Sequence, residues 1–265
     1  MPYRAGMTLV RSEVTAAVAT VTLDSPHNRN ALSAALISEL LAALAAAVAD
    51  DAVRVIVLSH AGPVFCSGAD LKETAATLEQ GTQRTVPAGR MGEVLAAVWD
   101  SPKPVVARVG GPARAGGLGL IAAADIAVCA TEATFAFTEV RLGLIPAVIS
   151  ATVLPRLIPR AAAELFLTGD SFDGTRAAEI GLVTAVVPAA ELDQTVARYA
   201  GSLVRGAPAA LASTKRLLRR GGDRAIRHEI AELTEKSVAF FASEEGREGV
   251  LSFVEKRDPA WVRRA

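Results

Sequence analysis

A glycine-rich turn that leads into a small-residue helix is the first feature of this sequence that could do chemistry. The turn contains Gly110-Gly111 and Gly116-Gly117, and the expected helix spans residues 118–124. The first N–H groups of a helix have no partner inside it, and glycine lets another molecule approach the backbone closely. The turn could therefore bind a negatively charged oxygen. Alternatively, its glycines only permit tight helix packing.

A second turn of the same kind favours the chemical interpretation. Residues 53–59 read as a buried strand, and the turn Ser67-Gly68-Ala69-Asp70 follows before another helix. Two strand–turn–helix units, each with an N–H at its turn, are what a pocket for an enolate requires. Cys66 could suggest a nucleophile, but no histidine motif accompanies it, so we expect a packed small side chain.

Glu139 is the carboxylate that could complete such a pocket. It stands alone after the alternating residues Phe135-Ala136-Phe137. A positioned carboxylate can carry a proton to or from a carbon atom or an added water. The alternative is a surface carboxylate paired with Arg141.

The composition limits the possible functions. A chain of 265 residues predicts one domain or a domain with an appendage. Its 28 basic and 28 acidic residues leave no electrostatic footprint for nucleic acid or an anionic membrane, and we expect neither as a partner. Two cysteines make no disulfide framework, and no N-terminal pattern suggests a signal peptide. We therefore expect a cytoplasmic protein.

Hydrophobic periodicity predicts the elements that hold these turns. Residues 8–23 read as two strands with a turn near residues 12–15, and Ser33 can cap an amphipathic, non-membrane helix over residues 34–49. Residues 78–90 are polar and interrupted by glycine and proline, which indicates a mobile segment bordering the pocket. A further helix is expected over 91–99, and extended chain over 105–109, 126–129 and 182–187. After Pro146 the chain is expected to be largely helical, with helices over 161–167, 176–180, 192–204, 208–219, 224–241 and 246–256.

Repeated strand–strand–helix units suggest a spiral of small sheets with helices outside, an α/β fold. We divide the chain into a core over residues 1–205 and a helical C-terminal region over residues 206–265. A helical tail of that length cannot bury its apolar face alone. We therefore expect the C-terminal region to take part in oligomerisation.

Five motifs in this order resemble the enoyl-CoA hydratase/isomerase family, or crotonase superfamily. They are FCSGADLKE, the GG turn with AADIAV, FAFTEVRLGLIP, LTGDSFDGTRAAEIGLV and SFVEKR. The resemblance runs from about residue 20 to the C-terminus. It implies the crotonase-type spiral of repeated β-β-α units with a C-terminal helical region. It also implies homotrimers, often paired into hexamers.

The resemblance assigns roles to the turns and to Glu139. The backbone N–H groups of Ala69 and Gly116 would bind the thioester oxygen of an acyl-CoA, and Glu139 would carry the proton. Coenzyme A would enter as part of the substrate, so we expect no permanently bound cofactor and no metal. Residues expected near coenzyme A are His27, Ala31, Leu32, Ser67, Asp70, Leu71, Lys72, Phe253 and Lys256. Each polar member has an alternative. His27 could be an exposed loop histidine, Asp70 could cap a turn or helix, and Lys72 could be a solvated lysine.

One departure from the family pattern affects the expected reaction. Typical hydratases of this family carry a second glutamate three residues after the oxyanion glycine, where this chain has Gly119. This position is expected to face the same pocket, one helical turn beyond Gly116. Another carboxylate, for example Glu93, could replace it. We rank an enoyl-CoA hydratase first, a Δ3,Δ2-enoyl-CoA isomerase second, and a thioester or C–C hydrolase third. A non-catalytic RNA-binding or interaction module of this fold is disfavoured by the zero net charge and by Glu139.

The sequence is most similar to methylglutaconyl-CoA hydratase-like members, which act in leucine degradation and also tend to have glycine at this place. A methylglutaconyl group ends in a carboxylate, which would need a cationic partner in the pocket. The candidate cations are Arg114, Arg90 and Arg141. Arg114 is the first choice because it lies beside the Gly116 donor, although a solvent-facing or phosphate-facing arginine is the alternative.

Overall fold

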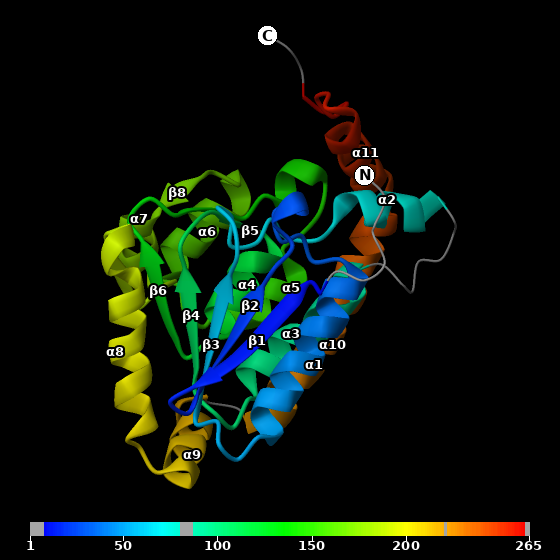
Figure 1. Ribbon diagram of the computed structural model, residues 1–265. Coiled ribbons are helices and arrows are strands. Elements are labelled where there is room, and N and C mark those ends of the chain that lie inside the picture. The colour runs from blue at the N-terminus through cyan, green and yellow to red at the C-terminus, as the bar shows by residue number, and fades with distance from the viewer. Residues whose placement is uncertain (1–7, 80–86, 220–221, 263–265) are drawn as a thin grey trace.

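A six-stranded sheet forms the centre of the computed structural model, which describes residues 8–79, 87–219 and 222–262. Its order is β1-β2-β3-β4-β6-β9 (Figure 1). β1 and β2 are antiparallel, whereas all later neighbours are parallel and need crossover connections. The strands are β1 (Val10–Thr15), β2 (Val18–Leu23), β3 (Val55–His60), β4 (Val105–Val109), β6 (Ile126–Ala130) and β9 (Ala185–Val187).

A second sheet of three short strands has the order β5-β7-β8. These strands are β5 (Ala113–Arg114), β7 (Thr134–Ala136) and β8 (Phe172–Asp173). The chain passes from β4 to β5 and then to α4, and from β6 to β7 and then to helices. Each pass therefore adds one strand to each sheet. This repeat is the β-β-α spiral that the sequence predicts.

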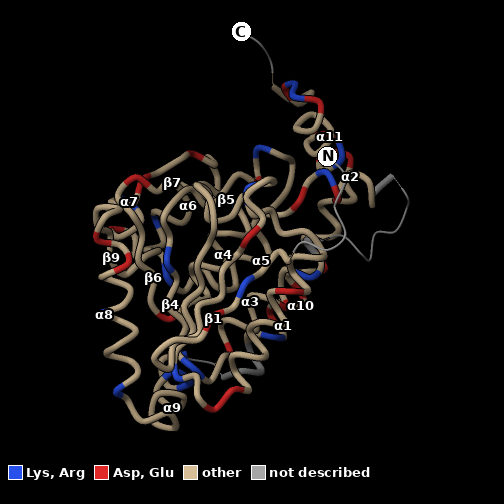
Figure 2. The backbone as a smooth tube through the Cα atoms, viewed as in Figure 1, with Lys and Arg blue, Asp and Glu red and all other residues tan. Residues whose placement is uncertain are grey.

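Helices cover the sheets and close the C-terminal end. Their bounds are η1 (Pro26–Asn28), α1 (Ala34–Ala49), α2 (Leu71–Glu79), α3 (Pro87–Trp99), α4 (Gly116–Ala123), η3 (Glu139–Leu142), α5 (Ala147–Val153), α6 (Pro159–Thr168), α7 (Gly174–Glu179), η4 (Ala189–Glu191), α8 (Leu192–Val204), α9 (Pro208–Leu218), α10 (Gly222–Ala242) and α11 (Glu244–Glu255). In the described part of the chain, no helix has the length and apolar character needed to cross a bilayer. Charged residues are spread over the surface with both signs intermingled (Figure 2).

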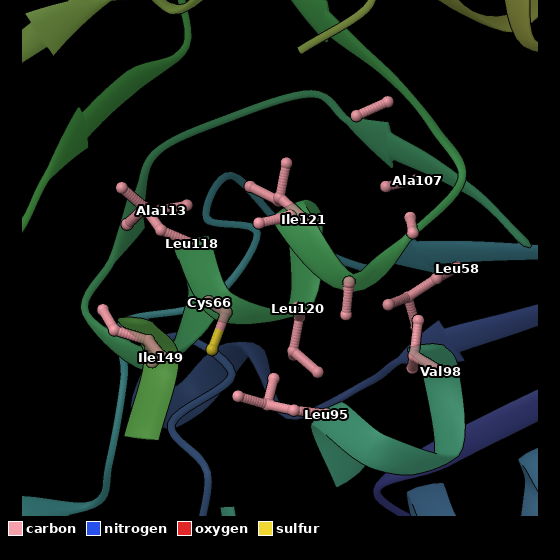
Figure 3. Close-up of a cluster of buried hydrophobic side chains, with 14 of the residues drawn as sticks. Leu58, Cys66, Leu95, Val98, Ala107, Ala113, Leu118, Leu120, Ile121 and Ile149 are labelled. Carbon is pink, nitrogen blue, oxygen red and sulfur yellow. The ribbon is translucent and has the colours of Figure 1, made fainter. Parts of the chain in front are cut away.

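Helix α4 lies at the middle of the hydrophobic core. All of its residues are buried, and Leu120 and Ile121 belong to one buried cluster with side chains from β3, α3 and α5 (Figure 3). Leu58, Leu95 and Ile149 represent those three elements in the cluster. Because interiors are packed at crystal-like density, a helix made of glycine, alanine and leucine can approach its neighbours closely. The core therefore fixes the position of the helix that begins with the oxyanion turn.

The local expectations are confirmed for the cap of α1 and differ for the first turn. The Ser33 hydroxyl caps α1 by accepting from the Leu36 N–H at 3.2 Å. The first hairpin turns at Ala16-Ala17, where φ is 49° and 66°, and not near residues 12–15, because that polar stretch is an exposed edge strand. Helix α5 lies in the stretch after Pro146 that is expected to be largely helical, although no bounds were predicted for it. The segment expected to be mobile falls partly on residues 80–86, outside the described residues, while residues 87–90 begin α3.

The C-terminal helices pack onto the core of the same chain. Helix α10 contacts α3 and α5, and α11 contacts η3 and α2. The approach to α3 is close, because a Cβ on Gly92 would lie 2.4 Å from the Cγ2 atom of Ile230. The division at residue 205 and the role in oligomerisation stay predictions.

Candidate active site

A cavity of about 1200 Å³ lies between the two glycine turns, η3, α5 and the end of α10. Ala69, Gly116 and Glu139 all line it. The structure thus brings together the three residues for which the sequence predicts catalytic roles. Cavities that bind small molecules typically have this order of volume.

The Ala69 N–H is turned towards the cavity by a single β-bridge. Leu32 donates its N–H to the Gly68 carbonyl at 2.8 Å and accepts from the Asp70 N–H at 3.4 Å. In such a parallel bridge the N–H of the intervening residue points away from the partner strand. Among the described residues, nothing accepts a hydrogen bond from the Ala69 N–H. This N–H is available to a ligand.

The Gly116 N–H is the first amide of α4. Ala115 precedes it with φ 47° and ψ −116°, and its carbonyl accepts from the N–H groups of Leu118 and Gly119. A left-handed non-glycine residue of this kind costs about 1–3 kcal/mol, which the surrounding structure must offset. Within the described chain the Gly116 N–H has no acceptor. The strained turn therefore presents a free donor at the positive end of a helix.

Backbone hydrogen bonds join the two turns. The Phe65 N–H donates to the Pro112 carbonyl at 3.0 Å, and the Arg114 N–H donates to the Cys66 carbonyl at 2.9 Å. The turns then approach so closely that a Cβ on Gly68 would lie 3.6 Å from the Gly116 nitrogen. Two unpaired N–H groups therefore stand side by side at one wall of the cavity, as an oxyanion site requires.

Glu139 faces the same cavity from the first position of η3. Its Oε2 atom is buried and has no hydrogen-bond partner among the described residues. Burial raises the pKa of this carboxyl from its usual 4.5 to about 7. A proton carrier is most effective when its pKa lies near the working pH. The alternative pairing with Arg141 is absent, because Arg141 forms its ion pair with Asp170 at 2.5 Å.

Helix α11 supports the turn that carries Glu139. A Cβ on Gly249 would lie 2.0 Å from the Leu142 carbonyl oxygen, so only glycine allows this contact. Gly143, with φ 63°, ends η3 against the backbone of Glu245 in the same way. The C-terminal helix thereby fixes the position of Glu139.

The raised pKa predicts a pH-dependent stability difference for Glu139→Gln. Between pH 4.5 and 7 the folded wild type keeps a proton that the unfolded chain has lost, so its free energy of unfolding falls as pH rises through this window. Above pH 7 the free energy of unfolding of the wild type is lower than at pH 4.5 by up to about 3 kcal/mol. Glutamine cannot ionise, so the variant should melt at a higher temperature than wild type at pH 8 and at a similar temperature near pH 4.5. Equal melting temperatures at pH 8 would contradict the burial of the charge.

Most residues expected to contact coenzyme A line the cavity. Leu32 is fully buried and lies outside the lining, and Lys256 ends α11 away from it. Asp70 also caps its own turn, since its Oδ1 atom accepts from the N–H groups of Lys72 and Glu73. The expected residues found in the lining are His27, Ala31, Ser67, Asp70, Leu71, Lys72 and Phe253.

The three candidate arginines have different positions. Arg114 lines the cavity, but its Nη1 atom donates to the Thr134 carbonyl at 2.6 Å and its Nη2 atom to the Thr134 hydroxyl at 3.1 Å. Arg141 lies at the rim in its pair with Asp170. Arg90 is outside the lining and pairs with Glu93 on α3.

The place expected for a second carboxylate is occupied by Ile149. A Cβ on Gly119 would lie 2.8 Å from the Ile149 Cγ2 atom and 3.2 Å from the Leu95 Cδ2 atom. Gly119 therefore faces the α4–α5 contact, and the expectation that its position opens into the pocket is wrong. Glu93 does not replace a carboxylate there, because it is exposed and lies outside the cavity lining.

Sequence reasoning missed two contributions to the cavity. Helix α5 supplies the apolar residues Ala147, Val148 and Ile149, and α2 supplies Glu73. Glu73 accepts from the Ala34 N–H at 3.1 Å, which places its carboxylate at the start of α1. The chain after Pro146 was expected to be largely helical, but no motif indicated that α5 would line the cavity. Cys66 is packed as expected, since burial raises the pKa of its thiol to about 12.

Comparisons with known proteins agree with the spiral fold. The chain belongs to the enoyl-CoA hydratase/isomerase family, whose sequence model matches residues 13–264. No group of acidic, histidine or cysteine residues in the described chain is arranged to hold a metal ion.

Individual relatives cover nearly the whole chain. A probable enoyl-CoA hydratase of Rhodobacter capsulatus is 34% identical over 96% of this chain and 98% of its own length. Carnitinyl-CoA dehydratase of Escherichia coli K12 is 35% identical over 91% of this chain and 93% of its own. The crystal structure of an enoyl-CoA hydratase from Mycobacterium avium is 43% identical, covers 97% of this chain and 100% of its own, and has a TM-score of 0.85. The protein is therefore an enzyme of this family.

Proposed function

We propose that this protein is an enoyl-CoA hydratase that adds water across the 2,3-double bond of an acyl-CoA thioester. The observation that carries the proposal is the convergence of two unpaired backbone N–H groups and one buried carboxylate on a single cavity. The names of several relatives support the same reaction. Hydration of a panel of 2-enoyl-CoA thioesters, followed by detection of 3-hydroxyacyl-CoA products, tests it.

In the proposed mechanism Glu139 transfers protons, and the two backbone amides stabilise negative charge. The Glu139 carboxylate accepts a proton from water as the water oxygen bonds to the β carbon. The π electrons of the double bond then move towards the thioester, and negative charge collects on its oxygen. The N–H groups of Ala69 and Gly116 stabilise that charge. Glu139 finally returns its proton to the α carbon, so one carboxylate serves as base and then as acid.

The proposed acyl group is branched and carries a terminal carboxylate, as in methylglutaconyl-CoA. We expect methylglutaconyl-CoA to give a higher kcat/KM than crotonyl-CoA, and Arg114→Ala to raise KM mainly for the carboxylated substrate. Steady-state kinetics of both proteins on both substrates measure this. Equal loss on both substrates would assign Arg114 to holding the turn through Thr134, and a wild-type preference for crotonyl-CoA would exclude the leucine pathway.

A second candidate, Δ3,Δ2-enoyl-CoA isomerisation, is favoured by one observation. Ile149 fills the space next to Gly119, so the cavity has no carboxylate at the position of the second glutamate of typical hydratases. Isomerisation needs only one base, which moves a proton between the α and γ carbons. Incubation with a 3-enoyl-CoA in deuterated water separates the two reactions by the product formed.

The proposed assembly is a homotrimer or a pair of trimers in the cytoplasm. Apolar residues of α11 are exposed in the single chain, with Phe253 49% and Leu251 44% accessible. Phe253 also lines the cavity, so a neighbouring subunit could cover part of the coenzyme A site. Sedimentation at several protein concentrations tests this assembly.

A further inference from the structure

His60 joins the bases of the two loops that carry the candidate oxyanion donors. It is the last residue of β3, and the loop leading to Ala69 begins directly after it. Its Nε2 atom accepts a hydrogen bond from the Gly110 N–H at 2.9 Å. Gly110 follows β4 and begins the loop leading to Gly116. His60 does not line the cavity, so any effect on the reaction must pass through these loops.

The hydrogen bond assigns the state of the His60 ring. Since Nε2 accepts from an amide, the neutral ring carries its proton on Nδ1. The ring also packs edge-on against Phe65, with 5.5 Å between centroids and 77° between planes. A Cβ on Gly110 would lie only 3.1 Å from Nε2. The ring is therefore in close contact with both Gly110 and Phe65.

The surroundings of His60 keep the ring neutral. The charged group that faces it is Arg108 on β4, which Asp193 of α8 holds in an ion pair at 2.5 Å. Burial, followed by the charge of Arg108, lowers the pKa of His60 to about 4. Near neutral pH the ring is therefore a permanent acceptor for the Gly110 N–H.

Backbone contacts continue from this hydrogen bond to the donors. A Cβ on Gly111 would lie 2.0 Å from the Pro63 carbonyl oxygen, so the loops touch immediately beyond His60 and Gly110. The hydrogen bonds from Phe65 to Pro112 and from Arg114 to Cys66 follow. These backbone contacts end just before Ala69 and Gly116. A series of contacts between the two loops therefore sets the relative position of the two donors. The first of these contacts is the hydrogen bond from the Gly110 N–H to the His60 side chain.

We propose that neutral His60 is a positioning residue of the oxyanion site: its acceptor on the Gly110 N–H fixes the register of the two loops, so that Ala69 and Gly116 donate to the same oxygen. This inference rests on the proposed function, because it concerns the donors that stabilise the thioester enolate. The proposal gives a residue outside the cavity lining a role in positioning the oxyanion donors.

Two substitutions separate the acceptor from the packing of the ring. His60→Phe keeps a ring beside Phe65 but removes the acceptor, whereas His60→Gln keeps an amide oxygen that can accept from Gly110. We expect His60→Phe to lower kcat about tenfold, a part of the 10²–10³ that a lost donor costs, with KM within about twofold of wild type. His60→Gln should retain kcat within about twofold. Equal kcat losses in the two variants, or a loss in His60→Phe that appears only in KM, would overturn the proposal.

A measurement without turnover keeps the inference separate from the proposed function. In ¹H–¹⁵N spectra of the Glu139→Gln protein, in which the cavity carboxylate with a pKa of about 7 no longer titrates, the Gly110 amide should shift between pH 8 and 4.5 as His60 begins to protonate, and the Ala69 and Gly116 amides should shift in parallel. Adding His60→Gln to this protein should remove that part of all three shifts, and any shift that remains in the double variant belongs to other groups, such as Glu73. Ala69 and Gly116 signals that stay fixed while Gly110 moves would overturn the proposal. A wild type that turns over no enoyl-CoA would remove the proposed function, whereas these spectra would still decide the role of His60.

Discussion

Glu139→Gln is expected to lower kcat by about 10²–10⁴ while the fold and the binding of coenzyme A are kept, because a positioned acid–base group usually contributes this much. Glutamine has the size of glutamate and can remain in the same buried place, but it cannot accept or return a proton. The variant needs no structural adjustment, since the Glu139 Oε2 atom has no hydrogen-bond partner among the described residues. Steady-state turnover of the best enoyl-CoA substrate measures the effect.

Glu73→Gln is the matched control for this experiment. Glu73 also lines the cavity with a partly buried carboxylate whose pKa is raised by burial. It already has a structural partner, the Ala34 N–H, and an amide oxygen can accept that hydrogen bond. We expect Glu73→Gln to stay within a few-fold of wild type. If Glu139→Gln retains more than about a tenth of the wild-type activity, another residue carries the proton. The same holds if Glu73→Gln loses more activity than Glu139→Gln.

The sequence was sufficient to predict the parts of the site that depend on the backbone. Glycine turns after buried strands have few possible conformations, and parallel strands deliver their C-terminal ends to one edge of a sheet. The two turns could therefore be predicted to form one pocket, whereas the family resemblance selected Ala69 and Gly116 as the donors within them. Glu139 came from the family resemblance, and the structure adds its reason: α11 holds the turn that carries it.

The side chains that fill space between helices could not be predicted in this way. Gly119 was expected to open into the pocket because it lies one helical turn beyond Gly116, but its direction depends on where α5 packs. The chain after Pro146 was expected to be largely helical, but no pattern indicated where α5 packs, so the role of Ile149 had no basis in the sequence. Likewise, the hydrogen bonds of Arg114 to Thr134 arise from the pairing of β5 with β7, which no local pattern indicates.

The strained backbone at Ala115 is a further feature that sequence reasoning cannot supply. Alanine rarely adopts φ 47°, and nothing in the residue type signals it. Hydrogen bonds from Leu118 and Gly119 to its carbonyl and from its own N–H to Ala136 hold the conformation. Tertiary contacts therefore set the direction of the Gly116 N–H, the first amide of α4. Its geometry should be sensitive to changes in the turn at Gly68, which faces Ala115.

Gly68→Ala tests that sensitivity and is expected to lower kcat by about 10²–10³, the cost of losing one oxyanion donor. Gly68 has φ +88°, and an added Cβ would lie 3.0 Å from the Ala115 Cβ atom and 3.2 Å from the Arg114 carbonyl oxygen. The new methyl group must push the two turns apart, so Ala69 and Gly116 can no longer donate to the same oxygen. Since substrate binding relies on many other contacts, KM should change far less than kcat.

Gly181→Ala provides the control, because Gly181 has nearly the same φ, +87°, and ends α7 outside the cavity lining. Its Cβ would lie 2.4 Å from the Arg156 carbonyl oxygen, so this variant should lose at least as much thermal stability as Gly68→Ala. Its kcat, measured well below the melting temperature of both variants, should stay near that of the wild type. If the two variants lose activity in proportion to their stability, the Gly68 effect is general unfolding. If Gly68→Ala keeps full kcat, the oxygen of the reacting thioester is not held between these two amides.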